Sequence, residues 1–269
     1  MLDPDRISAV IRDTAMREIV PRFRALASGD IREKKPGDLV TVADEAAERV
    51  LIRELAAAEP GSVALGEESV AANPALLDLI AGDAPVWVID PVDGTGNFAK
   101  GAPDFAVIVA YIRHGVTEAG WIYDPLGDVM LSGSRGDGVW CGGRRIRIAA
   151  DARPGQATGS AYGRTPGGIR AAQALTESGR VGSVRNRGCS GLEYIDVALG
   201  RTQFTLHSRS LPWDHAAGMM LVTEAGGRVR FLDDSPYDPR ITDRRPLAAA
   251  DERIWRLVQA VVTAPPTGG

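Results

Sequence analysis

The sequence predicts an α+β fold built from two lobes, residues 1–150 and 151–269, that pack together as one unit. Two patterns predict it. Helical segments near the N-terminus precede short apolar segments joined by glycine-rich turns, which is typical of an antiparallel meander. After about residue 150, helical and strand-like segments alternate. The 269 residues, 44% hydrophobic and 25% charged, fit a globular enzyme with a large core.

The N-terminal region is predicted to hold two helices. Apolar periodicity indicates an amphipathic helix over residues 5–26 and a second helix from about Asp44 to the Pro-Gly pair at 60–61. Thr41 and Asp44 have the spacing of a capping box. The segment between the helices, SGDIREKKPGD at 28–38, is predicted to be an exposed loop.

The middle of the chain is predicted to form strands. SVALGEES, residues 62–69, indicates a strand that ends in GEE, and residues 73–85 indicate a short helix and turn. VWVID, residues 86–90, is apolar without alternation, so we expect a strand buried on both faces. Four more strands between residues 105 and 149 complete the meander.

The second lobe is predicted to alternate helices and strands. The expected strands lie at 202–208 and 227–232, and the expected helices at 168–179, 190–200, 214–227 and 252–263. The last residues, APPTGG at 264–269, have the composition of a disordered tail.

Composition narrows the class of protein. The net charge is -4 and no long Lys/Arg block occurs, so no nucleic-acid partner is expected. No apolar run is long enough to span a bilayer, and the N-terminus lacks a signal-peptide core, so we expect a cytoplasmic protein without a membrane partner. Cys141 and Cys189 lie far apart, and three histidines show no metal-ligand spacing. Neither a disulfide framework nor a zinc site is expected, and any metal must be bound by oxygen.

The segment WVIDPVDGTGNF, residues 87–98, is the first candidate for chemistry. Asp90 ends the buried strand, and ligand sites in layered α/β structures gather beyond strand ends. Asp93, Gly94 and Thr95 lead into a predicted helical turn whose free amides attract anions. The alternative is a turn without function, because Asp-Pro and Asp-Gly are common turn pairs. An EF-hand is excluded, since it needs acidic or amide residues at alternate positions before its glycine, and here Pro91 and Val92 intervene.

Further acidic residues lie at comparable positions. Glu67 and Glu68 follow another apolar strand, and Asp214 stands at the predicted start of a helix. The alternatives are a solvated turn for GEES and an N-cap for Asp214. If the carboxylates converge, each pair about 4 Å apart repels by roughly 4 kcal/mol at an effective dielectric near 20. Divalent cations remove that repulsion, and all-oxygen ligation selects Mg²⁺, Mn²⁺ or Ca²⁺.

The motifs GEES, WVIDPVDGTGNF and PWDHAAGMMLVTEAGG occur in this order, with DLVTVAD ahead of them. Together they resemble the inositol monophosphatase family of Mg²⁺-dependent, lithium-sensitive phosphatases, from about Asp38 to Gly227. The resemblance implies the layered α-β-α-β-α sandwich shared with fructose-1,6-bisphosphatase. It also implies a phosphomonoesterase that uses water attack on a small phosphate ester, two or three Mg²⁺ ions with Mn²⁺ as a substitute, and a homodimer.

The resemblance also assigns roles to residues. The implied metal ligands are the carboxylates of Glu67, Asp90, Asp93 and Asp214 and the backbone carbonyl of Val92. The amides of Gly94 and Thr95 would bind phosphate. Thr95, oriented by Asp44, and Glu67 would activate the water. A family lysine corresponds to either Lys34 or Lys35.

The substrate pocket departs from the family pattern. Inositol-specific relatives carry Glu seven positions before the aspartate of the W-D motif, and here that position is His207. His207 is either a pocket residue or a surface loop residue. The implied alcohol pocket also includes Gly188, Cys189, Ser190 and Arg209.

The arginines of this region suggest a substrate with a second anionic group, because Arg185, Arg187 and Arg209 flank it. The alternatives within the superfamily are phosphatases of fructose-1,6-bisphosphate, 3'-phosphoadenosine 5'-phosphate or histidinol phosphate. A non-catalytic regulatory member is a further alternative.

A cysteine phosphatase is the rival from another class. Arg147 stands six residues after Cys141, as in a Cys-based phosphate loop. No His precedes the cysteine, no Ser or Thr follows the arginine, and the segment alternates like a strand.

Overall fold

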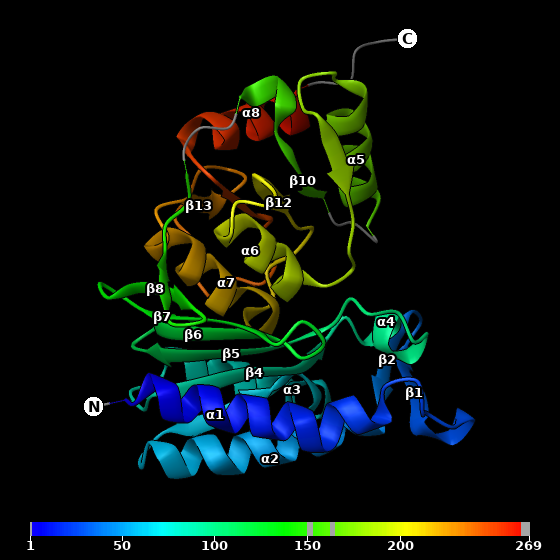
Figure 1. Ribbon diagram of the computed structural model, residues 1–269, viewed down its shortest axis with the longest axis vertical. Coiled ribbons are helices and arrows are strands. Elements are labelled where there is room, and N and C mark those ends of the chain that lie inside the picture. The colour runs from blue at the N-terminus through cyan, green and yellow to red at the C-terminus, as the bar shows by residue number, and fades with distance from the viewer. Residues whose placement is uncertain (1, 150–152, 162–164, 265–269) are drawn as a thin grey trace.

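A computed structural model describes residues 2–149, 153–161 and 165–264 of the protein (Figure 1). The N-terminal helix α1, Pro4–Thr14, continues as a π-helical turn at Ala15–Ile19 and a 3₁₀ turn at Val20–Arg22. The expected helix over 5–26 is therefore shorter and irregular at its end. Pro21 explains this, because it lacks the amide that would continue the helical hydrogen bonding.

A β-hairpin replaces the expected exposed loop. After a 3₁₀ turn at Ser28–Asp30, strands β1, Ile31–Lys35, and β2, Asp38–Thr41, pair antiparallel. Three of the five residues of β1 are exposed, so this strand lacks the apolar alternation by which a strand is recognised. Helix α2, Val42–Ala58, follows directly, and Thr41 and Asp44 form the predicted capping box.

The first sheet has seven strands in chain order. They are β3, Val63–Gly66; β4, Val86–Asp93; β5, Ala106–Arg113; β6, Val116–Asp124; β7, Val129–Ser134; β8, Gly138–Cys141; and β9, Arg144–Ile146. β3 pairs with β4 in parallel, and each later neighbour pairs antiparallel, which confirms the meander. Every residue of β4 is buried, as its unbroken apolar run predicts.

Short helices connect these strands. They are α3, Glu67–Ala72; a 3₁₀ helix at Pro74–Ala81; and α4, Thr95–Ala99. Glu67 and Glu68, expected at the end of a strand, are the first two residues of α3.

The second sheet has five strands in the order β11-β10-β12-β14-β13. They are β10, Thr158–Ala161; β11, Ser183–Arg185; β12, Phe204–Leu206; β13, Arg228–Phe231; and β14, Pro246–Ala249. The sequence reading missed β10, β11 and β14, because three or four small or mixed residues carry no readable alternation. The helices of this half are α5, Pro166–Glu177; α6, Ser190–Ala198; α7, Pro212–Glu224; and α8, Glu252–Thr263, with a 3₁₀ turn at Pro154–Gln156.

The elements form five layers, α-β-α-β-α, as the resemblance implies (Figure 1). α1 and α2 cover one face of the seven-stranded sheet, and α6 and α7 lie between the two sheets. α5 and α8 cover the outer face of the five-stranded sheet. One hydrophobic cluster fills each of the three regions where helices pack on a sheet. The lobe boundary near residue 150 stays a prediction. The tail expected at 264–269 lies outside the described residues from residue 265 on.

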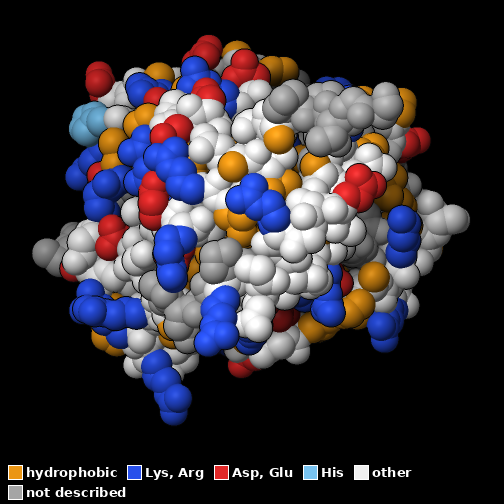
Figure 2. Space-filling model, turned by 90° about the horizontal axis from the view of Figure 1, so that it is seen from above, with side chains coloured by type: hydrophobic (Ala, Val, Ile, Leu, Met, Phe, Trp, Pro, Cys, Tyr) orange, Lys and Arg blue, Asp and Glu red, His pale blue; other side chains and the backbone are white. Residues whose placement is uncertain are grey.

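The surface above the five-stranded sheet carries basic and acidic side chains interspersed (Figure 2). Among these charges, Arg228 of β13 and Arg256 of α8 pair with Glu252 and Asp234. No helix among the described residues has the length and apolar character that a bilayer span requires.

Candidate active site

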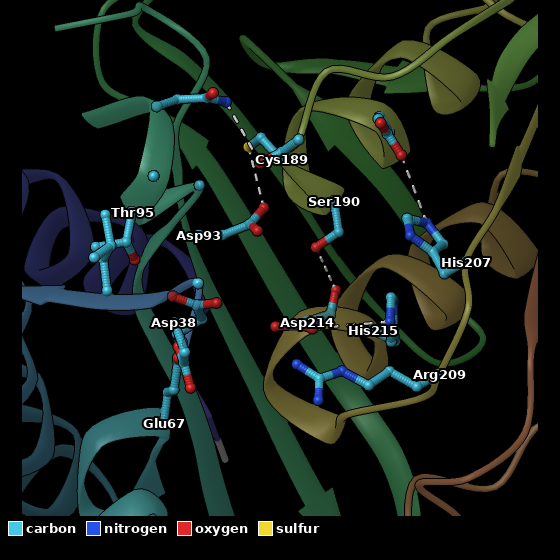
Figure 3. Close-up of a pocket in the computed structure, with 18 of the residues that line it drawn as sticks. Asp38, Glu67, Asp93, Thr95, Cys189, Ser190, His207, Arg209, Asp214 and His215 are labelled. Atoms are coloured by element: carbon cyan, nitrogen blue, oxygen red, sulfur yellow. Dashed lines mark hydrogen bonds and ion pairs between the residues drawn. The ribbon is translucent and has the colours of Figure 1, made fainter. Parts of the chain in front are cut away.

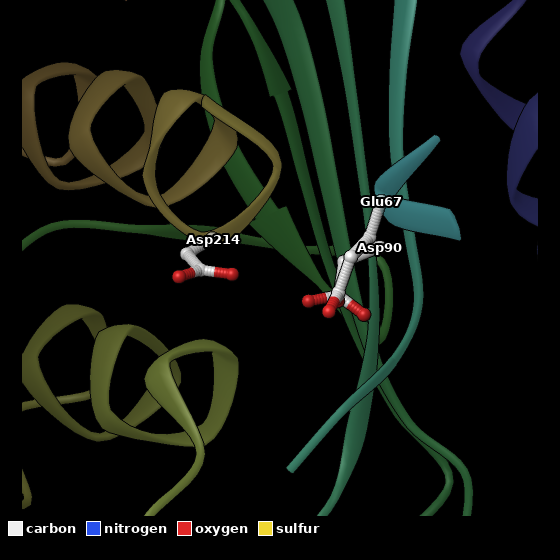
Figure 4. A group of neighbouring side chains, drawn as sticks. All are labelled: Glu67, Asp90 and Asp214. Atoms are coloured by element: carbon white, nitrogen blue, oxygen red, sulfur yellow. The ribbon is translucent and has the colours of Figure 1, made fainter. Parts of the chain in front are cut away.

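Three carboxylates from distant parts of the chain meet at one point. Glu67 begins α3, Asp90 lies in β4, and Asp214 lies in the first turn of α7. Each offers an oxygen atom, and these three atoms lie within 4.8 Å of one another (Figure 4). The N-cap of α7 is Leu211, so Asp214 does not cap the helix. The structure therefore brings together three residues that the sequence analysis selected separately.

Electrostatics make this cluster unfavourable without a cation. Burial, followed by repulsion from Glu67, Asp93 and Asp214, holds the pKa of Asp90 well above its usual range. Burial and the same kind of repulsion raise the pKa of Asp214. The donor set is all oxygen and is buried or half-buried, which fits a hard divalent cation such as Mg²⁺ and not zinc.

Asp93 is held by the start of α6. Its Oδ2 accepts hydrogen bonds from the Gly191 amide, at 2.6 Å, and from the Cys189 thiol, at 3.1 Å. Burial raises the pKa of Asp93, while these donors work to lower it. One carboxylate oxygen is thus fixed by the second half of the chain, and the residue lines the same pocket as Asp90.

In the turn after β4, the backbone of Gly94 lies very close to the backbone of Asp104. Gly94 has φ of 90°, and a Cβ there would lie 2.7 Å from the carbonyl oxygen of Asp104. Only glycine fits this position. The left-handed residue ends β4 and starts α4 at Thr95, which places the Gly94 and Thr95 backbone at the pocket wall.

The Thr95 hydroxyl is oriented by α2. Its Oγ1 lies 3.0 Å from Asp44 Oδ1 and 2.9 Å from the Val92 carbonyl oxygen, and it can donate its single proton to one of them. The other Asp44 oxygen accepts the amide of Thr41 at 2.9 Å. Burial raises the pKa of Asp44 to about 7, although hydrogen bonds from Thr41 and Thr95 work to lower it. The predicted Asp44–Thr95 contact is present.

The structure distinguishes Lys34 from Lys35. Lys34 Nζ lies 2.8 Å from Glu67 Oε1 and 2.9 Å from Glu68 Oε1. Its side chain is mostly buried in the hairpin β1–β2, whereas Lys35 makes no such contact among the described residues. The segment expected to be an exposed loop therefore supplies a cation to the site.

A pocket of about 180 Å³ connects these groups with the second lobe (Figure 3). All the candidate substrate residues line it: Gly188, Cys189, Ser190, His207 and Arg209. Ser190 Oγ donates to the Asp214 carbonyl oxygen at 3.0 Å, which ties the start of α6 to α7. Figure 3 shows Asp38, Glu67 and Asp93 on one side, and Asp214, His207 and Arg209 on the other.

His207 is a buried pocket residue, so the surface-loop alternative is wrong. It is 3% exposed, and its Nε2 lies 2.9 Å from Thr205 Oγ1. Thr205 donates to Glu193 Oε2, so its oxygen accepts the His207 Nε2–H and leaves Nδ1 as an acceptor. Burial lowers the pKa of His207 to about 3, which keeps the ring neutral at neutral pH.

The sequence analysis missed Glu193. This carboxylate of α6 is 2% exposed and lines the pocket. It accepts the Arg187 amide at 3.1 Å and the Thr205 hydroxyl at 2.9 Å. Burial raises its pKa to about 7. The available signal was a pair of carboxylates, Glu193 and Asp196, among the apolar residues of a helix whose nine residues are all buried.

Two of the three arginines proposed for a second anion do not serve the pocket. The Arg187 guanidinium binds Asp104 and Asp196, at 2.5 and 2.6 Å. Arg185 is exposed on β11 and is not a pocket residue. Arg209 lines the pocket, as does Lys100, which the sequence analysis did not select.

The cysteine phosphatase alternative is wrong. Cys141 lies in β8 and pairs with Leu131 and Arg144 across regular ladders, so no phosphate loop surrounds it. Both cysteines are free, and burial raises the pKa of each thiol, the opposite of nucleophile activation.

Comparison with known proteins agrees with this geometry. The inositol monophosphatase family matches residues 6–263. An inositol-1-monophosphatase of Mesorhizobium japonicum is 32% identical over 257 residues, 93% of this chain and 92% of that one. A fructose-1,6-bisphosphatase/inositol-1-monophosphatase of Thermotoga maritima is 32% identical over 199 residues, 73% of each chain. The solved structure of the extragenic suppressor protein suhB from Bartonella henselae superposes with a TM-score of 0.80 at 28% identity, and the match covers 96% of this chain and 98% of that one.

A family match over nearly the whole chain and relatives above 30% identity agree with the convergent carboxylates and the glycine–threonine turn. The chain therefore belongs to the inositol monophosphatase family, whose members are metal-dependent hydrolases of phosphoric monoesters.

Proposed function

We propose that this enzyme hydrolyses a small phosphate monoester whose alcohol carries a second anionic group. The observation that supports the hydrolysis is the meeting of Glu67, Asp90 and Asp214 beside the Gly94–Thr95 turn. The second anion is supported by two cations that line the same pocket, Arg209 and Lys100.

The metal ligands we assign are the carboxylates of Glu67, Asp90, Asp93 and Asp214 and the carbonyl oxygen of Val92. They would hold two or three Mg²⁺ ions, for which Mn²⁺ can substitute. When bound, such ions lower the pKa of a water molecule and neutralise phosphate charge.

The chain's own groups orient the reactants. The Gly94 and Thr95 amides bind phosphate oxygens, and the Thr95 hydroxyl, donating toward Asp44, accepts a hydrogen bond from the attacking water. The Glu67 carboxylate accepts the proton that the water loses. The water oxygen bonds to phosphorus while the bond from phosphorus to the ester oxygen breaks. The leaving oxygen takes a proton from solvent water, and the proton that Glu67 accepted returns to solvent, which balances it.

The alcohol half would lie against α6 and the segment after β12. The neutral His207 offers Nδ1 as an acceptor for a hydroxyl, in place of the carboxylate that inositol-specific relatives carry there. Arg209 is exposed, and its guanidinium has no hydrogen-bonding or ion-pair partner in the part of the chain that the structure describes. A sugar bisphosphate fits these groups, and one relative is named for both fructose-1,6-bisphosphate and inositol-1-monophosphate hydrolysis.

Assembly and location are also proposals. The family resemblance supports a homodimer, which size-exclusion chromatography with light scattering tests. The two free cysteines fit a reducing, cytoplasmic compartment.

Phosphate release with Mg²⁺ tests the function. The substrate panel is sugar monophosphates, sugar bisphosphates, inositol phosphates, nucleotide bisphosphates and histidinol phosphate. Arg209→Ala should lower kcat/KM for the best bisphosphate by roughly 10-fold or more, the usual value of a charge-assisted hydrogen bond. The exposed Arg185, outside the pocket, provides the control Arg185→Ala.

The test compares the loss of kcat/KM on bisphosphates with the loss on monophosphates. Arg209 also lowers the pKa of Asp214, so its loss affects every substrate to some extent. An equal loss on bisphosphates and monophosphates contradicts a second-anion site at Arg209.

A further inference from the structure

Glu48 is a buried carboxylate near the site to which the proposed mechanism gives no role. It is 5% exposed on α2, and no cation pairs with it in the described part of the chain. Its Oε2 accepts the Glu68 amide at 2.8 Å, and its Oε1 accepts the Ser69 amide at 2.9 Å. Both oxygens are therefore bonded to the turn that joins β3 to α3.

That turn carries Glu67. β3 ends at Gly66 and α3 begins at Glu67, so the two bonded amides follow the metal-ligand candidate directly. Amides in the first turn of a helix have no acceptor within the helix, and Gly66 has no side chain to supply one. Glu48 supplies both acceptors from a different helix, and it thereby fixes the backbone from which the Glu67 side chain projects.

Gly66 provides an independent observation. Its φ of −121° suits any residue, so the backbone does not require glycine there. A Cβ at Gly66 would instead lie 2.3 Å from both Cδ and Oε2 of Glu48. Glycine at this position is what leaves room for the Glu48 carboxylate.

Glu48 also stands one helical turn after Asp44, so both point from the same face of α2. Asp44 bonds to Thr95, and Glu48 bonds to the turn after Gly66. One face of one helix thus supports both groups that are assigned to water activation.

We propose that Glu48 is a positioning residue that holds Glu67 in the geometry needed to bind a divalent cation. The inference rests on the proposed function, because it requires Glu67 to be a metal ligand.

The test is Mn²⁺ binding by calorimetry to the full-length, metal-free protein. Glu48→Gln keeps the size of the side chain but presents an NH₂ group to one of the two amides. We expect Mn²⁺ to bind about 10- to 100-fold more weakly, the usual cost of losing a support to a metal ligand. Hydrogen exchange of the Glu68 and Ser69 amides should accelerate. The matched control is Glu54→Gln, a partly exposed glutamate of the same helix, which should change neither measurement.

The variant Gly66→Ala tests the same contact between Glu48 and the turn after β3 by changing the turn instead of Glu48. The new methyl group should displace the Glu48 carboxylate and weaken Mn²⁺ binding to a similar extent. In a Glu48→Ala background the space is vacant, so Gly66→Ala should then change the affinity less than about 2-fold if the two act as one unit. Equal effects of Gly66→Ala in both backgrounds would overturn the proposal.

The variant Glu67→Gln distinguishes a failure of the positioning role of Glu48 from a failure of the metal site itself. If Glu67→Gln weakens Mn²⁺ binding while folded Glu48→Gln binds it like the wild type, the positioning role is wrong and the metal site stands. If Glu67→Gln also leaves the affinity unchanged, the assigned metal site is wrong, and the proposal for Glu48 fails with it.

Discussion

Replacing Asp90 with Asn should abolish activity and stabilise the metal-free protein. The change is nearly isosteric, and the carbonyl oxygen of the new side chain can still accept the Val92 amide that Asp90 Oδ1 accepts at 3.0 Å. What changes is the charge at the centre of the cluster formed with Glu67 and Asp214.

The structure sets the size of the effect. At the 4.8 Å limit that separates the three carboxylate oxygens, two unit charges repel by about 3.5 kcal/mol at an effective dielectric near 20. Asp90 takes part in two of the three pairs, so with all three carboxylates ionised the relief is about 7 kcal/mol at this separation. Proton uptake by the cluster lowers this figure, in line with the raised pKa of Asp90 and of Asp214. We expect a gain of at least about 1 kcal/mol, or about 2 °C in Tm for a chain of this size.

Thermal unfolding of both proteins, in EDTA and in Mg²⁺, checks the stability. In EDTA the Asp90→Asn variant should melt at a higher temperature than the wild type. Mg²⁺ should raise the Tm of the wild type, because a ligand at 100 times its Kd adds about 2.7 kcal/mol to the free energy of unfolding. Mg²⁺ should have little effect on the Tm of the variant. Phosphate release should fall more than about 100-fold, because each well-placed electrostatic contact is typically worth that much.

Two outcomes would contradict the role assigned to Asp90. One is a variant that is less stable than the wild type in EDTA, which would mean that the carboxylates do not repel one another. The other is a variant that keeps more than about a hundredth of the rate, which would remove Asp90 from the centre of the metal site.

The remaining predictions concern burial. His207 has a folded-state pKa of about 3 and His215 one well below its usual range, both because of burial, whereas the unfolded chain titrates near 6.5. Stability from each is complete above about pH 6.5 and is lost as the pH falls, by about 1.4 kcal/mol per histidine between pH 7.5 and 5.5. Urea unfolding of wild type and His207→Gln should show an acid-induced loss smaller by that amount in the variant, and equal losses would contradict a neutral His207. Gly218→Ala should destabilise the protein by about 1–3 kcal/mol in the same assay, because the new Cβ would lie 2.1 Å from the buried ring of Tyr194; an unchanged urea midpoint would contradict the tight packing of α7 on α6.

Local sequence patterns were sufficient to predict many of the helices and strands. The unbroken apolar run of β4 predicted a strand buried on both faces, and that is how it lies. The Thr41–Asp44 spacing predicted a capping box, which is present. Such features depend on neighbours within a few residues, so they can be read from the chain directly. The β1–β2 hairpin was missed because a mostly exposed strand need not alternate.

For the site, the order of residues was enough to show which acids are available and where each stands relative to a strand or helix end. It selected Glu67, Asp90 and Asp214, and the family resemblance joined them into one site. Three contacts of the site became visible only in the folded chain: Lys34 faces Glu67, His207 is buried against Thr205, and Glu193 lines the pocket. Some of these contacts join segments that are far apart in the chain, and others depend on the direction in which a side chain faces. The packing of the layers sets the partners and the directions, and the neighbouring residues in the chain do not.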